Sequence, residues 1–260
     1  MNRHMESEAK KKLNKYLTSQ EQRNSRVELS ILHHYKQYAK TYAEIHNGIA
    51  VLSDLTANWS YTFMGQIAQR LHLSEAERKL EINSIWEDFL LERVHPEDLA
   101  VKHALELQFL DLLKRVPLKE RFNYRANTVL RIGGKGGQTL AMSHQIVYLN
   151  APGAVFPQLA LCCYTLLPDT EIAENNGSYI FNQLTGMRYP LNEQGLKETI
   201  SNREKQILNC IKEGMISKDI AAKLDLSIHT VNRHRQNILQ KLQVRNSHEA
   251  VQVFSRMSSR

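Results

Sequence analysis

The chain has 260 residues, which is enough for two domains that each bury a core of their own. Its composition is that of an ordinary folded protein, with 42% hydrophobic and 23% charged residues and a formal net charge of +7. No apolar run approaches the ~20 residues of a membrane span, and residues 1–17 are polar and rich in lysine, unlike a signal peptide. We therefore expect a cytoplasmic protein with no membrane partner.

Residues 1–45 form the first predicted element, an N-terminal helical segment. Between Val27 and Tyr42, apolar residues recur at helical spacing among charged ones. Such a stripe needs a partner. The neighbouring domain and the same helix of a second subunit both remain open as that partner.

The pattern over residues 46–168 mixes strands and helices. Residues 48–53 and 59–64 are predicted strands, and helical patterns then run over 65–93 and, with Pro96 in the first turn, on to residue 113. Three strand-rich runs follow, at 121–132, 139–149 and 156–167, separated by Gly- or Pro-rich turns. This order predicts an antiparallel sheet with helices on one of its faces.

That order, with His95-Pro96-Glu97-Asp98 before the long helix, resembles the PAS sensory domain over residues 46–168. The resemblance implies a sensing or dimerising role and a cavity that would take a small-molecule ligand. A receiver domain would need an acidic pair after its first strand, where Asp54 stands alone. An acyl-homoserine-lactone sensor domain is a closer rival, and the His-Pro-Glu-Asp element and strand order favour PAS.

Residues 169–196 are predicted to be a linker, in which 177–181 could add one more strand to the sensor. The chain then enters a C-terminal segment with strong helix signals. Ser201 and Glu204 have the spacing of a capping box, and Gly214 stands where a left-handed C-cap is needed. Further helix starts are expected at Ser217, Ser227 and Asn246.

The third of these helices, from Ser227 to about Leu242, separates an apolar face from a polar one. The residues expected to pack on the first two helices are Ile228, Val231, Ile238 and Leu242. The opposite face carries His229, Asn232, Arg233, Gln236 and Gln240. Arg can pair with guanine, and Asn or Gln with adenine, in the major groove of DNA. A solvated helix face has a similar composition, but the short helix and tight turn before it favour DNA reading.

Residues 197–254 closely resemble the C-terminal DNA-binding domain of LuxR-type bacterial transcription regulators. Among the matching residues are Arg203-Glu204, Ile207-Leu208, Gly214, Ser217-Lys218, Thr230-Val231, Lys241-Leu242 and Glu249-Ala250. The resemblance implies that the helix from Ser227 enters the major groove. It implies base contacts for Asn232, Arg233 and Gln236, and phosphate contacts for Lys218, Thr230 and Lys241. Asn232 stands where the family commonly has Lys, so the operator sequence does not carry over.

Charge and cysteine usage agree with this assignment. Residues 197–260 hold twelve Lys or Arg against six Asp or Glu, a net charge of +6 that suits a polyanion. Cys162, Cys163 and Cys210 have neither metal-ligand nor disulfide spacing, and packing is favoured over redox sensing for them. The histidines are scattered. We expect no metal, no cofactor and no catalytic site.

We interpret the chain as a sequence-specific DNA-binding transcription regulator and not an enzyme. Its fold is predicted as α+β, with an N-terminal PAS-like antiparallel sheet with helices and a C-terminal all-α four-helix helix-turn-helix domain at 197–260. The expected partners are double-stranded DNA, a second copy of the chain and a small molecule in the PAS-like domain. One alternative is a redox sensor with haem or flavin in that domain. The other is a protein-interaction module that uses its helix-turn-helix only for dimerisation, which the polar helix face disfavours.

Overall fold

The computed structural model describes residues 8–18, 27–78, 81–150, 154, 156–168, 178–192, 195, 199–242 and 244–258. The rest of the predicted N-terminal segment and of the predicted linker therefore lies outside the described residues. The chain divides into two compact units, residues 1–191 and 192–260. In the described ranges, no helix has both the length and the apolar character that crossing a membrane requires.

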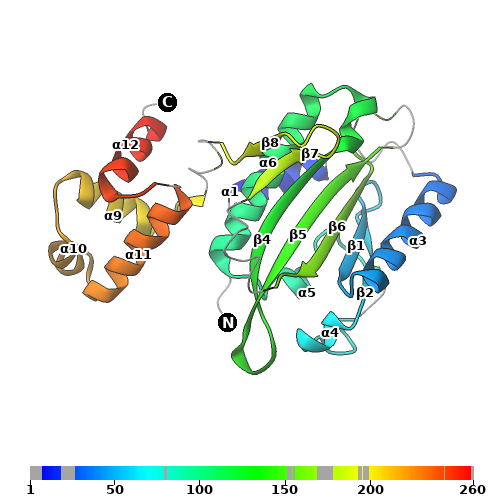
Figure 1. Ribbon diagram of the computed structural model, residues 1–260, viewed down its shortest axis with the longest axis horizontal. Helices are drawn as coiled ribbons and strands as arrows, with labels where there is room; N and C mark the ends of the chain where they lie inside the picture. Colours follow the sequence, from blue (N-terminus) through cyan, green and yellow to red (C-terminus); the bar gives the residue numbers. More distant parts are fainter. Residues whose placement is uncertain are drawn as a thin grey trace. The chain divides into compact units, whose positions relative to one another are not determined.

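An antiparallel sheet organises the first unit (Figure 1). Its described strands are β1 (Ile49–Asp54), β2 (Trp59–Met64), β3 (Glu81–Ile82), β4 (Tyr124–Gly133), β5 (Thr139–Leu149), β6 (Leu159–Leu166), β7 (Tyr179–Asn182) and β8 (Arg188–Pro190). They lie in the order β3-β2-β1-β6-β5-β4-β7-β8, so the first strand pairs with both the second and the sixth. The five long predicted strands and the extra strand after residue 177 are confirmed, whereas β8 was not predicted.

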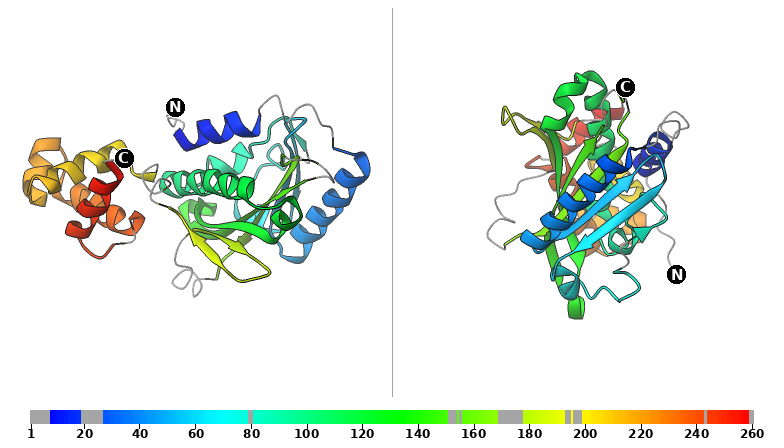
Figure 2. Two further views of the ribbon diagram at one scale, coloured as in Figure 1. Left: turned by 90° about the horizontal axis from the view of Figure 1, so that it is seen from above. Right: turned by 90° about the vertical axis from the view of Figure 1, so that its right-hand side faces the viewer.

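Helices cover both faces of this sheet, so the prediction of helices on one face is wrong. The described helices are α1 (Glu8–Leu17), α3 (Leu29–Ile45), α4 (Ile67–Arg70), α5 (Asp88–Leu91) and α6 (Pro96–Arg115). On one face, Ala39 and Ala43 of α3 pack on Ala50 and Leu52 of β1. On the other face, α6 packs on β4, and α1 lies along α6 (Figure 2). The physical reason is that every residue of β1 is buried, so neither of its faces tolerates water.

The apolar stripe between Val27 and Tyr42 finds its partner in the sheet of its own chain. Its partly buried side chains join the cluster around β1, β5 and β6; they are Val27, Ile31, Leu32, Tyr35 and Tyr42. Two other large side chains of α3, Tyr38 and Ile45, stay exposed at 55% and 74%. The neighbouring-domain alternative therefore accounts for the stripe.

The segment 65–93 is much less helical than predicted, because a left-handed residue and a set of local hydrogen bonds interrupt it. His72 takes a left-handed φ of 51°, which ends the turn that follows α4. Glu77 then accepts hydrogen bonds from the backbone N and the Oγ of Ser74, at 2.8 and 2.7 Å. These local bonds compete with helix formation. Only α4 and α5, of four residues each, are helical in the described part of this segment.

The predicted start of α6 at Pro96 is confirmed. His95 is its N-cap, and the imidazole Nδ1 accepts from the backbone N of Glu97 at 3.4 Å. Asp98 in the first turn accepts from the backbone N and the Nε of Arg131, at 2.7 and 2.9 Å. The His-Pro-Glu-Asp element thus fastens the start of α6 to β4.

The second unit contains α9 (Asn202–Lys212), α10 (Ser217–Leu224), α11 (Ile228–Lys241) and α12 (Ser247–Ser258). The described helices enclose one apolar core, whose buried members include Ile207, Leu208, Cys210, Ile220, Val231, Ile238, Leu242 and Ala250. The predicted core is confirmed with one exception. Ile228, the first residue of α11, is 48% exposed.

Candidate nucleic-acid interface

The helix-turn-helix consists of α10, a tight turn and α11. Asp225 ends α10 in the left-handed conformation, with φ 51°, and the backbone N of Leu226 donates to the Ala221 carbonyl at 2.9 Å. Ser227 then caps α11, because its Oγ accepts from the backbone N of Thr230 at 3.0 Å. These bonds close the turn and fix the direction in which α11 leaves it.

Five polar side chains project from this motif and have no partner among the residues that the structure describes. Lys218 lies in the first turn of α10, and the others lie on one face of α11: His229, Asn232, Arg233 and Gln236. All five are exposed, and in the part of the chain that the structure describes none of them forms a hydrogen bond or an ion pair. Their donors and acceptors are therefore available to an external ligand. The structure brings together these five predicted residues, with Ser227 and Thr230 at the adjoining helix start.

Lys241 lies apart from this group. Its ammonium is 2.9 Å from both carboxylate oxygens of Glu204, and its side chain is only 8% exposed. Glu204 in turn accepts from the backbone N of Ser201 at 2.8 Å, and the Ser201 Oγ accepts from the Glu204 backbone N at 3.2 Å. The predicted capping box is confirmed. The predicted phosphate contact of Lys241 does not fit this placement, because the ammonium is already held inside the domain.

Arg235 is a structural residue that the sequence did not reveal. Its guanidinium donates to the Oγ of Ser217 at 3.2 Å and to the Oγ of Ser247 at 3.0 Å, so it joins α11 to both α10 and α12. The prediction that Ser217 caps α10 is wrong: Ile216 occupies the N-cap, and Ser217 is the first helical residue. No sequence signal marks Arg235, because its partners are 18 and 12 residues away along the chain.

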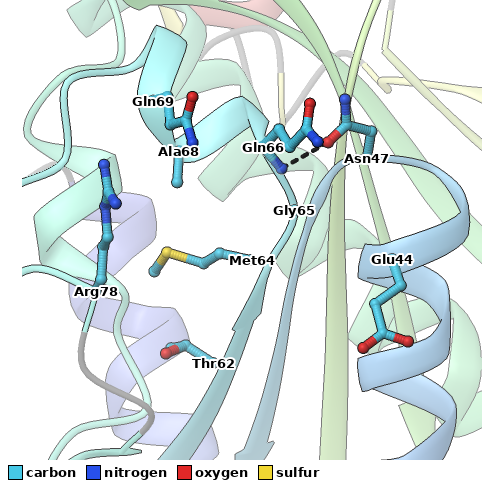
Figure 3. Close-up of a pocket in the computed structure, with 9 residues that line it drawn as sticks. All are labelled: Glu44, Asn47, Thr62, Met64, Gly65, Gln66, Ala68, Gln69 and Arg78. Atoms are coloured by element: carbon cyan, nitrogen blue, oxygen red, sulfur yellow. Dashed lines mark hydrogen bonds between the residues drawn. The ribbon is translucent and has the colours of Figure 1, made fainter.

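A surface pocket of about 600 Å³ lies in the first unit (Figure 3). Its walls come from the end of α3, from β2, from α4 and from Arg78. In Figure 3, Met64 extends toward Arg78 across the hollow, and Gln69 lies above them. The guanidinium and amide groups would suit a polar small molecule.

The α6 side of the sheet buries several ionisable groups. Lys102 and Glu106 form an ion pair at 2.8 Å with both side chains almost fully buried. Burial lowers the pKa of the neighbouring His103 to about 2. On the opposite face, burial raises the pKa of Cys163 to about 12, so this thiol is protonated and inert, as the packing prediction requires.

Comparison with known proteins supports the assignment of the second unit. Residues 198–254 match the family model described as bacterial regulatory proteins, luxR family, so this unit carries a LuxR-family helix-turn-helix domain. The chain is 38% identical over 60 residues to the response regulator protein TmoT of Ectopseudomonas mendocina, covering 23% of this chain and 27% of that protein. It is 44% identical over 55 residues to the transcriptional regulatory protein UhpA of Salmonella typhimurium, covering 21% and 28%. The chain thus spans about a quarter of the length of these curated relatives.

Two solved structures are similar over longer stretches at low identity. The Vibrio cholerae VqmA dimer, a LuxR-type receptor, aligns with a TM-score of 0.34 and 16% identity over 87% of this chain and 86% of that one. The PAS-B domain of Drosophila melanogaster Cycle aligns with a TM-score of 0.30 and 11% identity, over 46% of this chain and 99% of that one.

Proposed function

We propose that this chain is a sequence-specific DNA-binding transcription regulator, whose LuxR-family domain reads the major groove and whose PAS-like unit receives a signal. The observation that carries the proposal is the free polar face of α11. Asn232, Arg233 and Gln236 are exposed there and have no internal partner in the described structure, on a helix that Ser227 caps and Arg235 holds in place.

Each residue of this surface has a role that its chemistry suits. Arg233 can donate two parallel hydrogen bonds to guanine, and Asn232 and Gln236 can pair with adenine. His229 is one turn nearer the start of α11 and would contact an adjacent base or phosphate. Ser227, Thr230 and Lys218 stand where α11 begins and α10 begins, and we assign them to phosphates, since helix N-termini and ammonium groups favour anions.

The regulator is proposed to act as a homodimer. One such domain has a small interface with DNA, and pairing on a two-fold site supplies the missing affinity. Tyr38 and Ile45, seven residues apart on α3, give an apolar exposed surface outside the DNA-binding unit. A small molecule bound in the pocket beside the end of α3 could change how that helix pairs, and we propose this as the route of the signal.

Selection of DNA from a random duplex pool tests the function. The full chain should enrich one two-fold sequence motif. The triple variant Asn232→Ala, Arg233→Ala, Gln236→Ala should enrich none while it keeps the helical circular dichroism of the parent. Absence of any enriched motif with the parent chain would overturn the proposal, and equal enrichment by the triple variant would overturn the assignment of α11.

A further inference from the structure

The helix-covered face of the first unit brings together three side chains of the kind that bind metal ions. They are Glu87 before α5, His144 on β5 and Cys162 on β6, and all three are buried. A carboxylate oxygen, an imidazole nitrogen and the thiol sulfur lie within 4.8 Å of one another. The proposed DNA-reading function uses none of them.

Strand register explains how this cluster forms. In the β5–β6 pair, His144 lies opposite Tyr164, and Ile146 lies opposite Cys162. His144 and Cys162 are therefore diagonal neighbours on the same face of the sheet. Glu87 reaches them from the segment before α5, where its carboxylate accepts a hydrogen bond from the Tyr164 hydroxyl. That bond holds one carboxylate oxygen and leaves the second for another ligand.

His144 is fully buried, yet neither of its ring nitrogens has a hydrogen-bond partner among the described residues. A neutral imidazole carries one N–H and one lone pair, and burying both without partners is costly. The nearest carboxylate oxygen, on Glu106, is 3.8 Å from Nε2, which is too long for a hydrogen bond. An ion that accepts the lone pair of one nitrogen would remove the part of this cost that comes from the unpaired lone pair.

The acidic side chains around the cluster also favour a bound cation. Lys102 forms an ion pair with Glu106 at 2.8 Å, and the side chains of Lys102, Glu106 and Glu87 are all almost fully buried. A divalent ion that displaces the proton of the Cys162 thiol adds two positive charges and one negative charge. The net change is one added positive charge beside these carboxyl groups, and the proton of the thiol leaves to solvent.

We propose that Glu87, His144 and Cys162 form a binding site for a divalent first-row transition ion, with Zn²⁺ as the ion it suits best. Oxygen, nitrogen and sulfur in one ligand set select Zn²⁺ over Mg²⁺ or Ca²⁺, which prefer oxygen alone. Ligand atoms around Zn²⁺ are roughly 3.5 Å apart, so these side chains need to close by about 1 Å. The bound ion would join β5, β6 and the segment before α5.

Cobalt is the probe for this site, because a Co²⁺–thiolate bond gives a charge-transfer absorption that zinc lacks. The full chain is produced with Co²⁺ in the growth medium, since the ligands are buried and loading from outside is slow. We expect one Co²⁺ per chain, a thiolate charge-transfer band, and loss of the band when Zn²⁺ replaces Co²⁺. Cys162→Ser should remove the band and weaken binding by more than about 100-fold, since even outer-shell partners are worth 10–100-fold.

Cys163→Ser is the matched control. Cys163 is the next residue of β6 and is also buried, but it packs in the cluster under α3 on the opposite face of the sheet. This variant should keep the band. A parent chain without the band, or a band that survives Cys162→Ser and is lost in Cys163→Ser, would overturn the site.

X-ray absorption at the metal edge of the parent chain keeps the proposal testable if Cys162→Ser fails to fold. The expected shell contains one sulfur together with imidazole nitrogen and carboxylate oxygen. A shell of nitrogen and oxygen alone would overturn the assignment. His144→Gln should weaken binding to a similar degree as Cys162→Ser, and unchanged affinity in that variant would overturn the role of the imidazole.

Discussion

The ammonium of Lys241 contacts both carboxylate oxygens of Glu204 at 2.9 Å, and this buried pair joins the end of α11 to the start of α9. Glu204 also closes the capping box with Ser201. The Glu204 carboxylate therefore stabilises the start of α9 and also fixes the C-terminal end of α11, the helix that we assign to the major groove.

Replacing Lys241 by Met should destabilise the second unit by about 3 kcal/mol, because it leaves the Glu204 carboxylate buried and unpaired. Hydrogen exchange of the α9 and α11 amides in the full chain measures this change. The control is Lys218→Met, at an exposed lysine that has no partner in the described part of the chain. This substitution should alter stability by less than about 0.5 kcal/mol and should weaken DNA binding instead. Equal effects of the two substitutions on exchange would contradict the structural role of the pair.

Arg233→Ala should cost on the order of 1–3 kcal/mol of specific DNA binding and relax the preference at one base position, because the guanidinium is assigned to a base edge. Titrations against the selected operator and a scrambled duplex give the comparison. Lys223→Ala serves as the control, since Lys223 is exposed on α10 but paired with Glu213 at 2.9 Å. Equal losses on both duplexes would show that Arg233 contacts only the backbone.

The stability of the first unit should fall as pH drops below about 6.5, in part because of His103. Burial, and then the charges of Lys102 and Lys10, lower its folded-state pKa to about 2. As the pH falls through the pKa of the unfolded state, His103 therefore takes up a proton in the unfolded chain but not in the folded chain. The free energy of unfolding is greatest above that pKa and decreases as the pH falls. Urea unfolding followed by tryptophan fluorescence isolates this unit, since Trp59 and Trp86 are the two tryptophans of the chain.

His103→Gln removes this titration. The difference in unfolding free energy between the variant and the parent should increase in favour of the variant by roughly 1 kcal/mol when the pH is lowered from 6 to 5. A difference between the two proteins that stays constant over this range would mean that His103 is protonated in the folded state.

The chain should sediment as a homodimer and bind a site whose half-sites are about one helical turn apart. Tyr38→Glu combined with Ile45→Glu should give a monomer with weaker operator binding, because both side chains are apolar surface on α3. The matched control is Leu184→Glu, an exposed leucine in the turn between β7 and β8. A parent chain that is monomeric both free and on DNA would rule out the dimer.

A fragment from Gly195 to the end should fold alone, because the second unit has its own apolar core. It should be only marginally stable, as expected for a domain of about 65 residues. Its DNA binding should fall steeply with salt, since residues 197–260 carry a net charge of +6. Circular dichroism and binding at two salt concentrations check both statements. An unfolded fragment would place the boundary elsewhere, and salt-insensitive binding would refute the electrostatic contribution.

The sequence alone determined the parts of this protein that depend on residues close together in the chain. The capping box of Ser201 and Glu204, the cap at Ser227 and the apolar spacing of α9 to α11 were predictable, since helix caps and helix faces span only three to seven residues. The long strands were predictable for the same reason, because alternation and turns are local signals.

Only the tertiary structure decided how distant residues meet. Helices on both faces of the sheet, the Lys241–Glu204 pair and the bridge from Arg235 to Ser217 and Ser247 all join separate elements. Glu87, His144 and Cys162 show the limit most clearly, because they have no metal-ligand spacing along the chain and yet share one buried cluster. Strand register and helix packing determine such contacts. A local sequence pattern does not specify which strands become neighbours.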